Sequence, residues 1–429
     1  MASLRTWLLA SWLVLAPVVS GPAFAQDLTQ ALPEDVGLSS ERLQRLSDVL
    51  QDYVDDGRLA GAVALVARSD MVVYLESFGY RDLESRSPMH EDAIFRIASQ
   101  TKALVSVGIM MLQEQGLLLI TDPVGKYLPE FQSTTVAEAR EGGGYEVVEA
   151  ERPITIRHLL THTSGISYGD GVAADRWADA GIQGWYFANR DEPIGSTVAR
   201  MAALPFDAQP GERWIYGYST DILGAVIERV SGLALDEFLR TRILEPLGMY
   251  DTHFYLPEEK RDRLAVVYSA SEDGAIERAP DPGGMVGQGA YVDGPRRSFS
   301  GGAGLLSTAS DYARFLQMML NGGELDGTRI LSRKTVELMT VDHLRDLQLS
   351  DGVGFGLGFS VVKDLGARGL PGSVGEFGWG GAYHSVYWVD PDEQLVVVYL
   401  TQLIPANGID DHGKLRALVY QALDDDEGW

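Results

Sequence analysis

Two serines in this sequence stand three residues before a lysine, and the pairs are Ser99 with Lys102 and Ser360 with Lys363. A serine hydroxyl becomes a strong nucleophile when a neighbouring base removes its proton, and a lysine held away from water can act as that base. Residues i and i+3 share one face of a helix but lie on opposite faces of a strand. The chemistry of each pair therefore depends on the element that carries it.

The segment that follows Ser99 contains ALVSVGIMML, which is apolar on nearly every side and predicts a buried helix. Ser99 would stand near the N-terminus of this helix, where free N–H groups and the helix dipole favour developing negative charge. The segment GFGLGFSVVKD around Ser360 and Lys363 is glycine-rich and strand-like, so we predict that this second pair is accidental. Taken alone, Ser99 also suits an N-cap and Lys102 a side chain that reaches solvent.

The surrounding elements place strands at both ends of the chain and helices between them. Apolar residues at helical spacing predict a helix over 39–56, and two strands are predicted around a Ser69–Asp70 turn. We therefore predict an α+β fold whose sheet comes from residues 36–98 and 300–429. A mostly helical lobe over 99–299 would be inserted, with the active site between the lobes.

Composition narrows the classes of function. The chain has 429 residues, of which 45% are hydrophobic and 22% charged, as in a folded protein with more than one lobe. Its formal charge of −26 disfavours nucleic acid and anionic lipid as partners. The absence of cysteine excludes disulfides, thiolate metal sites and a thiol nucleophile.

The first 25 residues combine a basic start, an apolar core and small residues before Ala25. This pattern predicts a secretory signal peptide that is cleaved near Ala25. The mature chain, 26–429, would then be periplasmic or secreted and would have no stable membrane span.

The chain resembles the penicillin-recognising serine hydrolases, which include class C-like β-lactamases and family VIII carboxylesterases. The resemblance covers nearly all of the mature chain and is carried by IFRIASQTKAL, DPVGKYLPEF, ITIRHLLTHTSGI, GAVIERVSG and SGGAGLLSTASDYARFLQMMLNGG. It implies a β-lactamase/DD-peptidase-like fold, an antiparallel sheet flanked by helices, and no metal or organic cofactor. It also implies that Ser99 is the acylated nucleophile and Lys102 its base partner.

The family's second motif is Tyr-x-Asn, and the corresponding stretch here is WIYGYSTDILG. In the family the tyrosine stands eight or nine residues before the glycine of an LG pair. Tyr216 is eight residues before Gly224 and Tyr218 is six, so the resemblance assigns the catalytic role to Tyr216. Tyr218 would take the asparagine position as a substrate-binding residue. Whether Lys102 or Tyr216 accepts the serine proton stays open, because the two would titrate as a coupled pair.

The third motif, Lys-Thr-Gly in β-lactamases, corresponds here to Trp379, Gly380, Gly381 and Ala382. Family VIII esterases resemble this form. Glycines let a substrate lie against the strand backbone, so Trp379, Gly380 and Gly381 are predicted to bind substrate. By resemblance, the backbone N–H groups of Ala382 and Ser99 form an oxyanion hole. By itself, the stretch GWGGA would also suit a turn between strands.

Two further patterns compete with this interpretation. GISYG, residues 165–169, matches Gly-x-Ser-x-Gly, but a nucleophile elbow needs a strand before it and a helix directly after it. We therefore predict that Ser167 is a coincidental match. His158 and His162 have the spacing of a metal-binding pair, but no third ligand is apparent nearby, and His162 is predicted to make buried hydrogen bonds.

These observations predict a secreted serine hydrolase that forms a covalent acyl-enzyme with a small-molecule acyl substrate, most simply as a carboxylesterase on small acyl esters. A β-lactamase or a D-amino-acid peptidase of the same fold is the alternative reaction. A catalytically inactive peptidoglycan-binding protein is the alternative of another class. The intact Ser99, Lys102 and Tyr216 favour an enzyme, and the sequence does not indicate the oligomeric state.

Overall fold

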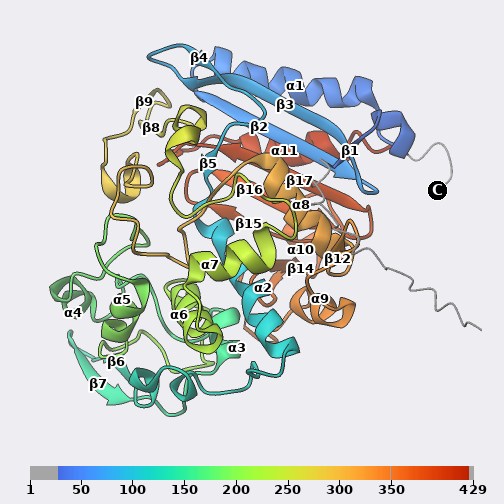
Figure 1. The fold of residues 1–429 in the computed structure, drawn as a ribbon. Coiled ribbons are helices and arrows are strands. Elements are labelled where there is room, and N and C mark those ends of the chain that lie inside the picture. Colours follow the sequence, from blue (N-terminus) through green and yellow to red (C-terminus); the bar gives the residue numbers. More distant parts are fainter. Residues whose placement is uncertain (1–27, 348, 425–429) are drawn as a thin grey trace, which may run out of the picture.

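The computed structural model describes residues 28–347 and 349–424, so the predicted signal peptide lies outside the described residues. Figure 1 shows one large sheet with helices on both faces, and a lobe of helices and loops beside it. Within the described ranges, no helix is both long enough and apolar enough to cross a bilayer.

The large sheet is built from the two ends of the chain. Its strands are β1 Thr29–Gln30, β2 Gly61–Arg68, β3 Met71–Asp82, β4 Ser87–Pro88, β13 Val353–Phe355, β14 Ser360–Val362, β15 Phe377–Gly381, β16 Ser385–Asp390 and β17 Leu395–Thr401. They lie in the order β1, β3, β2, β17, β16, β15, β14, β13, with β4 paired to β3. Neighbours are antiparallel except β1, which runs parallel to β3.

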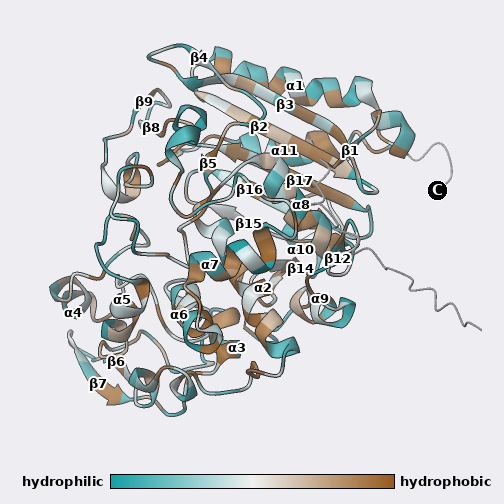
Figure 2. Cartoon of the chain, viewed as in Figure 1, coloured by the Kyte–Doolittle hydropathy of each residue, from teal (hydrophilic) through white to brown (hydrophobic). Residues whose placement is uncertain are grey.

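The sequence of β2 explains why helices cover both faces of this sheet. Ala62 and Val66 pack into the core on one face, whereas Val63 and Leu65 pack into the core on the other. Successive side chains of a strand point to opposite faces, so an unbroken apolar run such as GAVALVA makes both faces apolar. Figure 2 shows the hydrophobic colour along these central strands.

Two pairs of helices bury the two faces. One face is covered by α1 and α11, which pack together, and the core on the opposite face includes α2 and α8. Figure 1 shows α2 running from the sheet into the helical lobe, where it packs against α6 and α7. The bounds are α1 Ser40–Asp55, α2 Thr101–Glu114, α6 Ser219–Ser231, α7 Leu235–Leu239, α8 Ala309–Leu320 and α11 Asp411–Tyr420.

The remaining elements are short and lie mostly in the second lobe and its connections. The helices are α3 Ile156–Leu160, α4 Ala174–Asp179, α5 Ile194–Met201, α9 Arg333–Met339 and α10 Leu365–Arg368. Four two-stranded pairs complete the fold: β5 Phe95–Arg96 with β10 Leu306–Ser307, β6 Thr135–Ala139 with β7 Tyr145–Glu149, β8 Tyr268–Ala270 with β9 Ile276–Arg278, and β11 Glu324–Leu325 with β12 Thr328–Arg329.

The predicted fold class is confirmed, and so are the local elements that rested on clear patterns. The helix predicted over 39–56 is α1, and the predicted Ser69–Asp70 turn joins β2 to β3 with positive φ at both residues, 51° and 67°. The exact residue bounds of the two lobes, at 98/99 and 299/300, stay a prediction.

Candidate active site

Ser99 lies in a tight turn immediately before α2. A 3₁₀ turn over Ala98–Gln100 leads directly into the helix at Thr101, and Ala98 has a positive φ of 41°. A non-glycine residue in this region carries backbone strain, which structures retain mainly where the surroundings fix it. Every residue from 93 to 112 is buried except Ser99, which is partly exposed. The turn therefore presents one hydroxyl at the edge of an otherwise buried segment.

Lys102 lies below Ser99 on the first turn of α2, as the helical spacing predicted. Its side chain is only 2% exposed, and its Nζ is 3.2 Å from Ser99 Oγ. The same Nζ donates to Tyr168 Oη at 3.0 Å and to the Gly302 carbonyl at 2.7 Å. An ammonium group has three N–H donors, so these three contacts use all of its hydrogen-bonding capacity. The interpretation of Lys102 as a side chain that reaches solvent is wrong.

Tyr168 is a site residue that the sequence reasoning missed. It stands next to Ser167 in GISYG, whose Gly-x-Ser-x-Gly pattern draws attention to the serine and not to the tyrosine. Burial raises the pKa of the Tyr168 phenol well above its ordinary value, and the neighbouring Tyr216 and the Asp221 charge raise it further. Tyr168 therefore stays protonated at neutral pH and holds Lys102 as a neutral phenol.

Tyr216 meets Lys102 with its ring rather than with its hydroxyl. Lys102 Nζ lies 4.6 Å from the centre of the Tyr216 ring, in a cation–π arrangement. The Tyr216 hydroxyl instead accepts a hydrogen bond from Trp379 Nε1 at 3.0 Å. Trp214 stacks on Tyr216 with ring centres 5.7 Å apart, and Phe355 contacts Trp379 edge-on at 5.3 Å. Tyr216 and Trp379 thus belong to one aromatic wall beside Lys102.

Gly217 brings the two tyrosine segments together. A Cβ at residue 217 would lie 2.3 Å from the Ile166 carbonyl oxygen and 2.5 Å from that of Ser167. Only glycine allows backbones to approach this closely. The segment that carries Tyr216 is therefore pressed against the segment that carries Tyr168, and the Tyr168 and Tyr216 ring centres are 5.7 Å apart.

Tyr218 does not occupy the substrate-binding position that the resemblance assigned to it. Its side chain is completely buried, and its hydroxyl donates to the backbone carbonyls of Tyr168 and Gly184. Two carbonyl acceptors inside the protein fix a phenol in place, and a side chain with no accessible surface has none to offer a substrate. Tyr218 supports the segment that carries Tyr168. It also occupies the N-cap position of α6.

Asp221 is a second residue that the sequence reasoning missed, and it lies behind Lys102. Its carboxylate is 1% exposed and accepts hydrogen bonds from Ser300 Oγ at 2.6 Å and from the Gly302 amide at 3.1 Å. Burial raises the pKa of Asp221, while Ser300, the Lys102 charge and the Gly302 amide oppose that rise. The carbonyl of the same Gly302 accepts from Lys102, so Asp221 helps to fix the acceptor of Lys102.

The end of β15 lies directly against the Ser99 turn. A Cβ at Gly381 would lie 2.5 Å from the Ile97 carbonyl oxygen, so a larger residue would push the strand away. Trp379, Gly380, Gly381 and Ala382 are all partly exposed, in contrast to the buried start of the strand. The third motif therefore forms an accessible edge beside the partly exposed Ser99.

Neither of the two competing patterns, the GISYG match and the His158–His162 pair, forms the site that it would predict. Ser167 Oγ accepts from the Gly169 amide, and the short helix α3, not a strand, precedes this segment. His158 belongs to the N-terminal capping box of α3, whereas His162 is buried beneath Tyr216, with ring centres 4.7 Å apart. Burial, followed by the charge of Lys102, lowers the pKa of His162 well below its ordinary value, so His162 is neutral.

The ligand-type side chains that could share a metal ion lie in another place. Among the residues that the structure describes, the group whose donor atoms come within 4.8 Å of one another is His384, Asp411 and His412. This group borders the turn that follows Ala382 and does not include His158 or His162.

The arrangement around Ser99 suits proton exchange between a hydroxyl and a buried amine, next to a partly exposed strand edge. The sequence and the fold also match known proteins. The Beta-lactamase family model matches residues 46–421. Esterase EstB of Burkholderia gladioli is 35% identical over 377 residues, which cover 83% of this chain and 89% of EstB.

Two further proteins are similar to this chain, one in sequence and one in solved structure. Lovastatin esterase of Penicillium rubens is 32% identical over 308 residues, covering 70% of this chain and 73% of that protein. The solved structure of EstCE1, described as a hydrolase with promiscuous acyltransferase activity, has a TM-score of 0.76 and 28% identity. It covers 88% of this chain and 98% of EstCE1.

Proposed function

The chain belongs to the beta-lactamase family of serine hydrolases, and from that premise we propose that it is a carboxylesterase acting on small, uncharged acyl esters through a covalent acyl-enzyme. One observation carries the proposal: the partly exposed Ser99 hydroxyl faces the buried Lys102 amine, beside a third motif that has no cation. The esterases among the relatives are consistent with it.

The first step is attack of Ser99 Oγ on the ester carbonyl carbon. A neutral lysine amine has two N–H groups and one lone pair. If the N–H groups remain on Tyr168 Oη and the Gly302 carbonyl, the lone pair points toward Ser99. Lys102 then takes the Ser99 proton as the Oγ–C bond forms, and the carbonyl oxygen becomes an oxyanion.

The oxyanion would be held by the backbone N–H groups of Ser99 and Ala382. Donors of this kind act at full strength in the transition state because they are already in position. The intermediate then collapses, the bond to the leaving alcohol breaks, and the alcohol takes a proton from the Lys102 ammonium group. Tyr216 is the proposed relay for this proton, since its ring lies against Lys102 Nζ and the Trp379 N–H holds its hydroxyl in place at 3.0 Å.

The preference for uncharged esters follows from the third motif. The lysine of Lys-Thr-Gly supplies positive charge near the carboxylate of a β-lactam, whereas Trp379 offers an indole. The two arginines that could replace that charge are engaged elsewhere: Arg296 donates to the Leu256 and Val292 carbonyls, and Arg297 pairs with Asp191. A carboxylate at this position would therefore lose its water without gaining a cation.

Acyl transfer to an alcohol is the second reaction that we propose. The acyl-enzyme is the same, and the product depends only on whether water or an alcohol attacks it. The partly exposed indoles of Trp379 and Trp214 in the aromatic wall favour an apolar acceptor beside Ser99. An added alcohol should raise the release of p-nitrophenol from p-nitrophenyl butyrate if deacylation limits the rate, and a new butyrate ester should form.

We also propose export of the chain, on the basis of the signal-peptide pattern that ends near Ala25. N-terminal sequencing of the protein recovered from the expressing cells tests this proposal. A start near Gln26 supports it, and an intact Met1 contradicts it.

The central test uses the purified mature protein with p-nitrophenyl acetate and butyrate, followed by a fluorophosphonate probe and mass spectrometry. We expect hydrolysis of both esters and a single modified peptide that contains Ser99. An unlabelled protein that hydrolyses neither ester and binds peptidoglycan would overturn the assignment as an enzyme.

A further inference from the structure

The turn that carries Ala382 is anchored from outside the active site. It joins β15 to β16 and is closed by a hydrogen bond from the His384 amide to the Gly381 carbonyl at 3.1 Å. His384 has a positive φ of 61°, an uncommon conformation for a residue with a side chain. A tight turn of this kind needs contacts that hold it: Tyr383 packs in a core cluster with Ala98, and the His384 side chain reaches Asp411 on α11.

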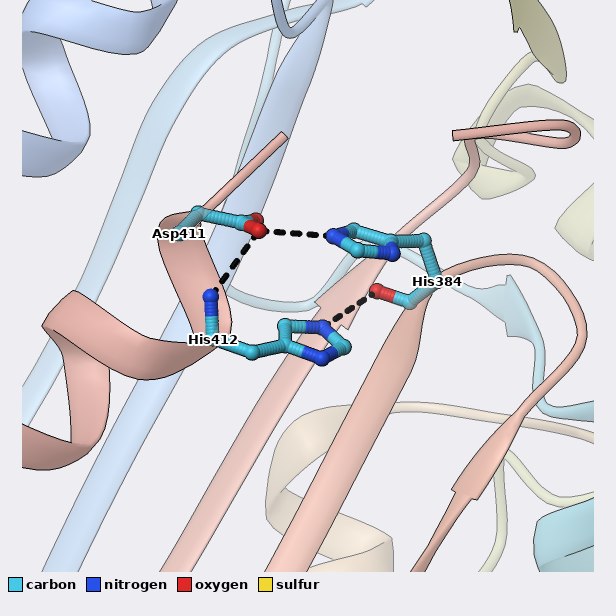
Figure 3. A group of neighbouring side chains, drawn as sticks. All are labelled: His384, Asp411 and His412. Carbon is cyan, nitrogen blue, oxygen red and sulfur yellow. Dashed lines mark hydrogen bonds and ion pairs between the residues drawn. The ribbon is translucent and has the colours of Figure 1, made fainter. Parts of the chain in front are cut away.

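The main anchor is the pair His384 and Asp411, shown in Figure 3. His384 Nε2 lies 2.7 Å from Asp411 Oδ1, and Asp411 is the first residue of α11. The Asp411 carboxylate is completely buried and accepts two more hydrogen bonds, from Tyr399 Oη at 2.9 Å and from the His412 amide at 2.9 Å. Its position is therefore fixed by the sheet and by the helix at once.

A second set of contacts holds the backbone of the turn. His412 Nε2 lies 3.2 Å from the His384 carbonyl, so this nitrogen carries the proton and donates. Thr401 Oγ1 on β17 lies 2.9 Å from the same carbonyl and 3.1 Å from that of Tyr383. The turn is thus connected to β17 and α11 by side chains that approach both its backbone and its histidine.

The carboxylate of Asp411 remains ionised in this setting. Burial alone would raise its pKa, but the hydrogen bond and the charge of His384 lower it below the ordinary value. Hydrogen bonds to an ionised group are shorter and roughly twice as strong as neutral ones. The bond between His384 and Asp411 is therefore a charge-assisted contact that holds the turn to α11.

A shared metal ion does not explain this cluster. The His384 and His412 rings are stacked, with centres 3.9 Å apart and planes inclined by 12°. The lone pair of an imidazole lies in the plane of its ring. An ion about 2.0–2.1 Å from both rings would therefore sit between two nearly parallel planes, outside either lone-pair direction.

We propose that the His384–Asp411 pair is a positioning device that sets the place of the Ala382 amide from behind the active site. This inference rests on the proposed function, in which that amide binds the oxyanion. An oxyanion donor must be held within a few tenths of an ångström, and a displacement of about 1 Å can cost on the order of a hundredfold in rate. Ala382 is two residues from His384, so loosening of His384 reaches it directly.

Two substitutions of His384 separate positioning from general stability. Asparagine tolerates positive φ but is too short to reach Asp411. Glutamine can place its amide N–H close to the position of Nε2 and can keep the bond. We expect His384→Asn to lower kcat by roughly thirtyfold with KM changed by less than about threefold, because the oxyanion forms only in the transition state. His384→Gln should recover most of that loss.

Tyr53→Phe is the matched control. Tyr53 donates to Asp410, the neighbour of Asp411 at the start of α11, but it does not contact the turn. It should alter the melting temperature without altering kcat. Should His384→Asn fail to fold, Asp411→Asn keeps the side-chain shape and removes the charge, and kcat should then fall about fivefold.

The possible results separate this inference from the function on which it rests. A wild-type protein that hydrolyses no ester refutes the proposed function. If the wild type is active and His384→Asn keeps the wild-type kcat, only the positioning role is refuted. The same holds if His384→Gln loses as much kcat as His384→Asn, because the glutamine then rescues nothing. An unchanged kcat in Asp411→Asn refutes it as well.

Discussion

The two Ser-x-x-Lys stretches have the same spacing and opposite surroundings. Ser99 and Lys102 lie on consecutive turns at the start of α2, and their Oγ and Nζ atoms are 3.2 Å apart. Ser360 lies on β14, and its Oγ donates to the Gly378 carbonyl at 2.7 Å. Lys363 follows that strand and pairs with Asp342 at 2.8 Å. The helical spacing brings Ser99 and Lys102 together, whereas Ser360 and Lys363 contact different residues.

The surroundings of the two lysines differ just as strongly. Lys102 is 2% exposed and contacts a hydroxyl, a phenol and a carbonyl, with no carboxylate in direct contact among the described residues. The Lys363 side chain is 40% exposed and has an acidic partner. A lysine can exchange a proton readily only where no carboxylate holds it in the charged form. Spacing alone therefore does not make a catalytic pair, and the element and the burial decide.

The largest expected effect comes from removal of the Ser99 hydroxyl. Ser99→Ala should lower kcat by roughly ten-thousandfold or more, because the covalent step loses its nucleophile. It should also abolish fluorophosphonate labelling. Ser360→Ala and Ser167→Ala should both retain wild-type kcat and labelling. The Ser167 hydroxyl only accepts a hydrogen bond from the Gly169 amide. Loss of labelling in Ser167→Ala with labelling kept in Ser99→Ala would move the nucleophile to GISYG.

The tyrosines around Lys102 sharpen the same comparison, since Lys363 has no such neighbours among its described contacts. We expect Tyr216→Phe to lose at least about a hundredfold in kcat, the usual scale for a proton-transfer group. Tyr168→Phe should lose about tenfold, since the phenol holds Lys102 but stays protonated. Tyr218→Phe should change kcat less than either, because its hydroxyl contacts only backbone carbonyls.

Steady-state kinetics with p-nitrophenyl butyrate measure this order. If Tyr168→Phe loses more than Tyr216→Phe, then Tyr168 is the tyrosine that moves the proton, and the assignment by spacing to Gly224 is wrong.

Substrate preference gives a smaller effect. The kcat/KM values for p-nitrophenyl acetate and butyrate should exceed those for nitrocefin and benzylpenicillin, because Trp379 cannot pair with a carboxylate. Trp379→Lys should raise the β-lactam-to-ester ratio about tenfold, since a charge-assisted hydrogen bond contributes about 1.5–3 kcal/mol. A wild-type β-lactam constant equal to the ester constants would show that another cation reaches the site.

The smallest effect concerns the stability that Lys363 provides. Burial raises the pKa of Asp342, but the hydrogen bond from Lys363 and two backbone amides outweigh it and lower the pKa below the ordinary value. The stabilisation is therefore present above the unfolded pKa of aspartate and is lost as pH falls through the lower, folded value.

Lys363→Ala should cost less than about 1 kcal/mol at pH 7, as for other partly exposed ion pairs. The difference from wild type should shrink toward pH 2, and kcat should not change. Urea unfolding at both pH values measures it, and a difference that grows on acidification would contradict the sign.

Local pattern in the sequence was sufficient to predict that Ser99 and Lys102 come together. The apolar run after Ser99 predicts a buried helix, and helical spacing then brings Lys102 beneath Ser99, because residues three apart share a helix face. The strand-like runs at the two chain ends, read with the family resemblance, were sufficient for the fold class. The helix and its spacing depend on neighbours within a few residues, which the sequence contains directly.

The partners of Lys102 and of His384 were decided only by the tertiary structure. Tyr168 reaches Lys102 across 66 residues of chain, and Asp411 reaches His384 across 27. The Tyr218 side chain points inward, where its hydroxyl donates to two backbone carbonyls. The residues next to it in the sequence are equally compatible with a tyrosine that faces the substrate. Local spacing fixes which side chains share one face of a helix. Packing between distant segments decides which residues of those segments contact that face, and no short pattern encodes that packing.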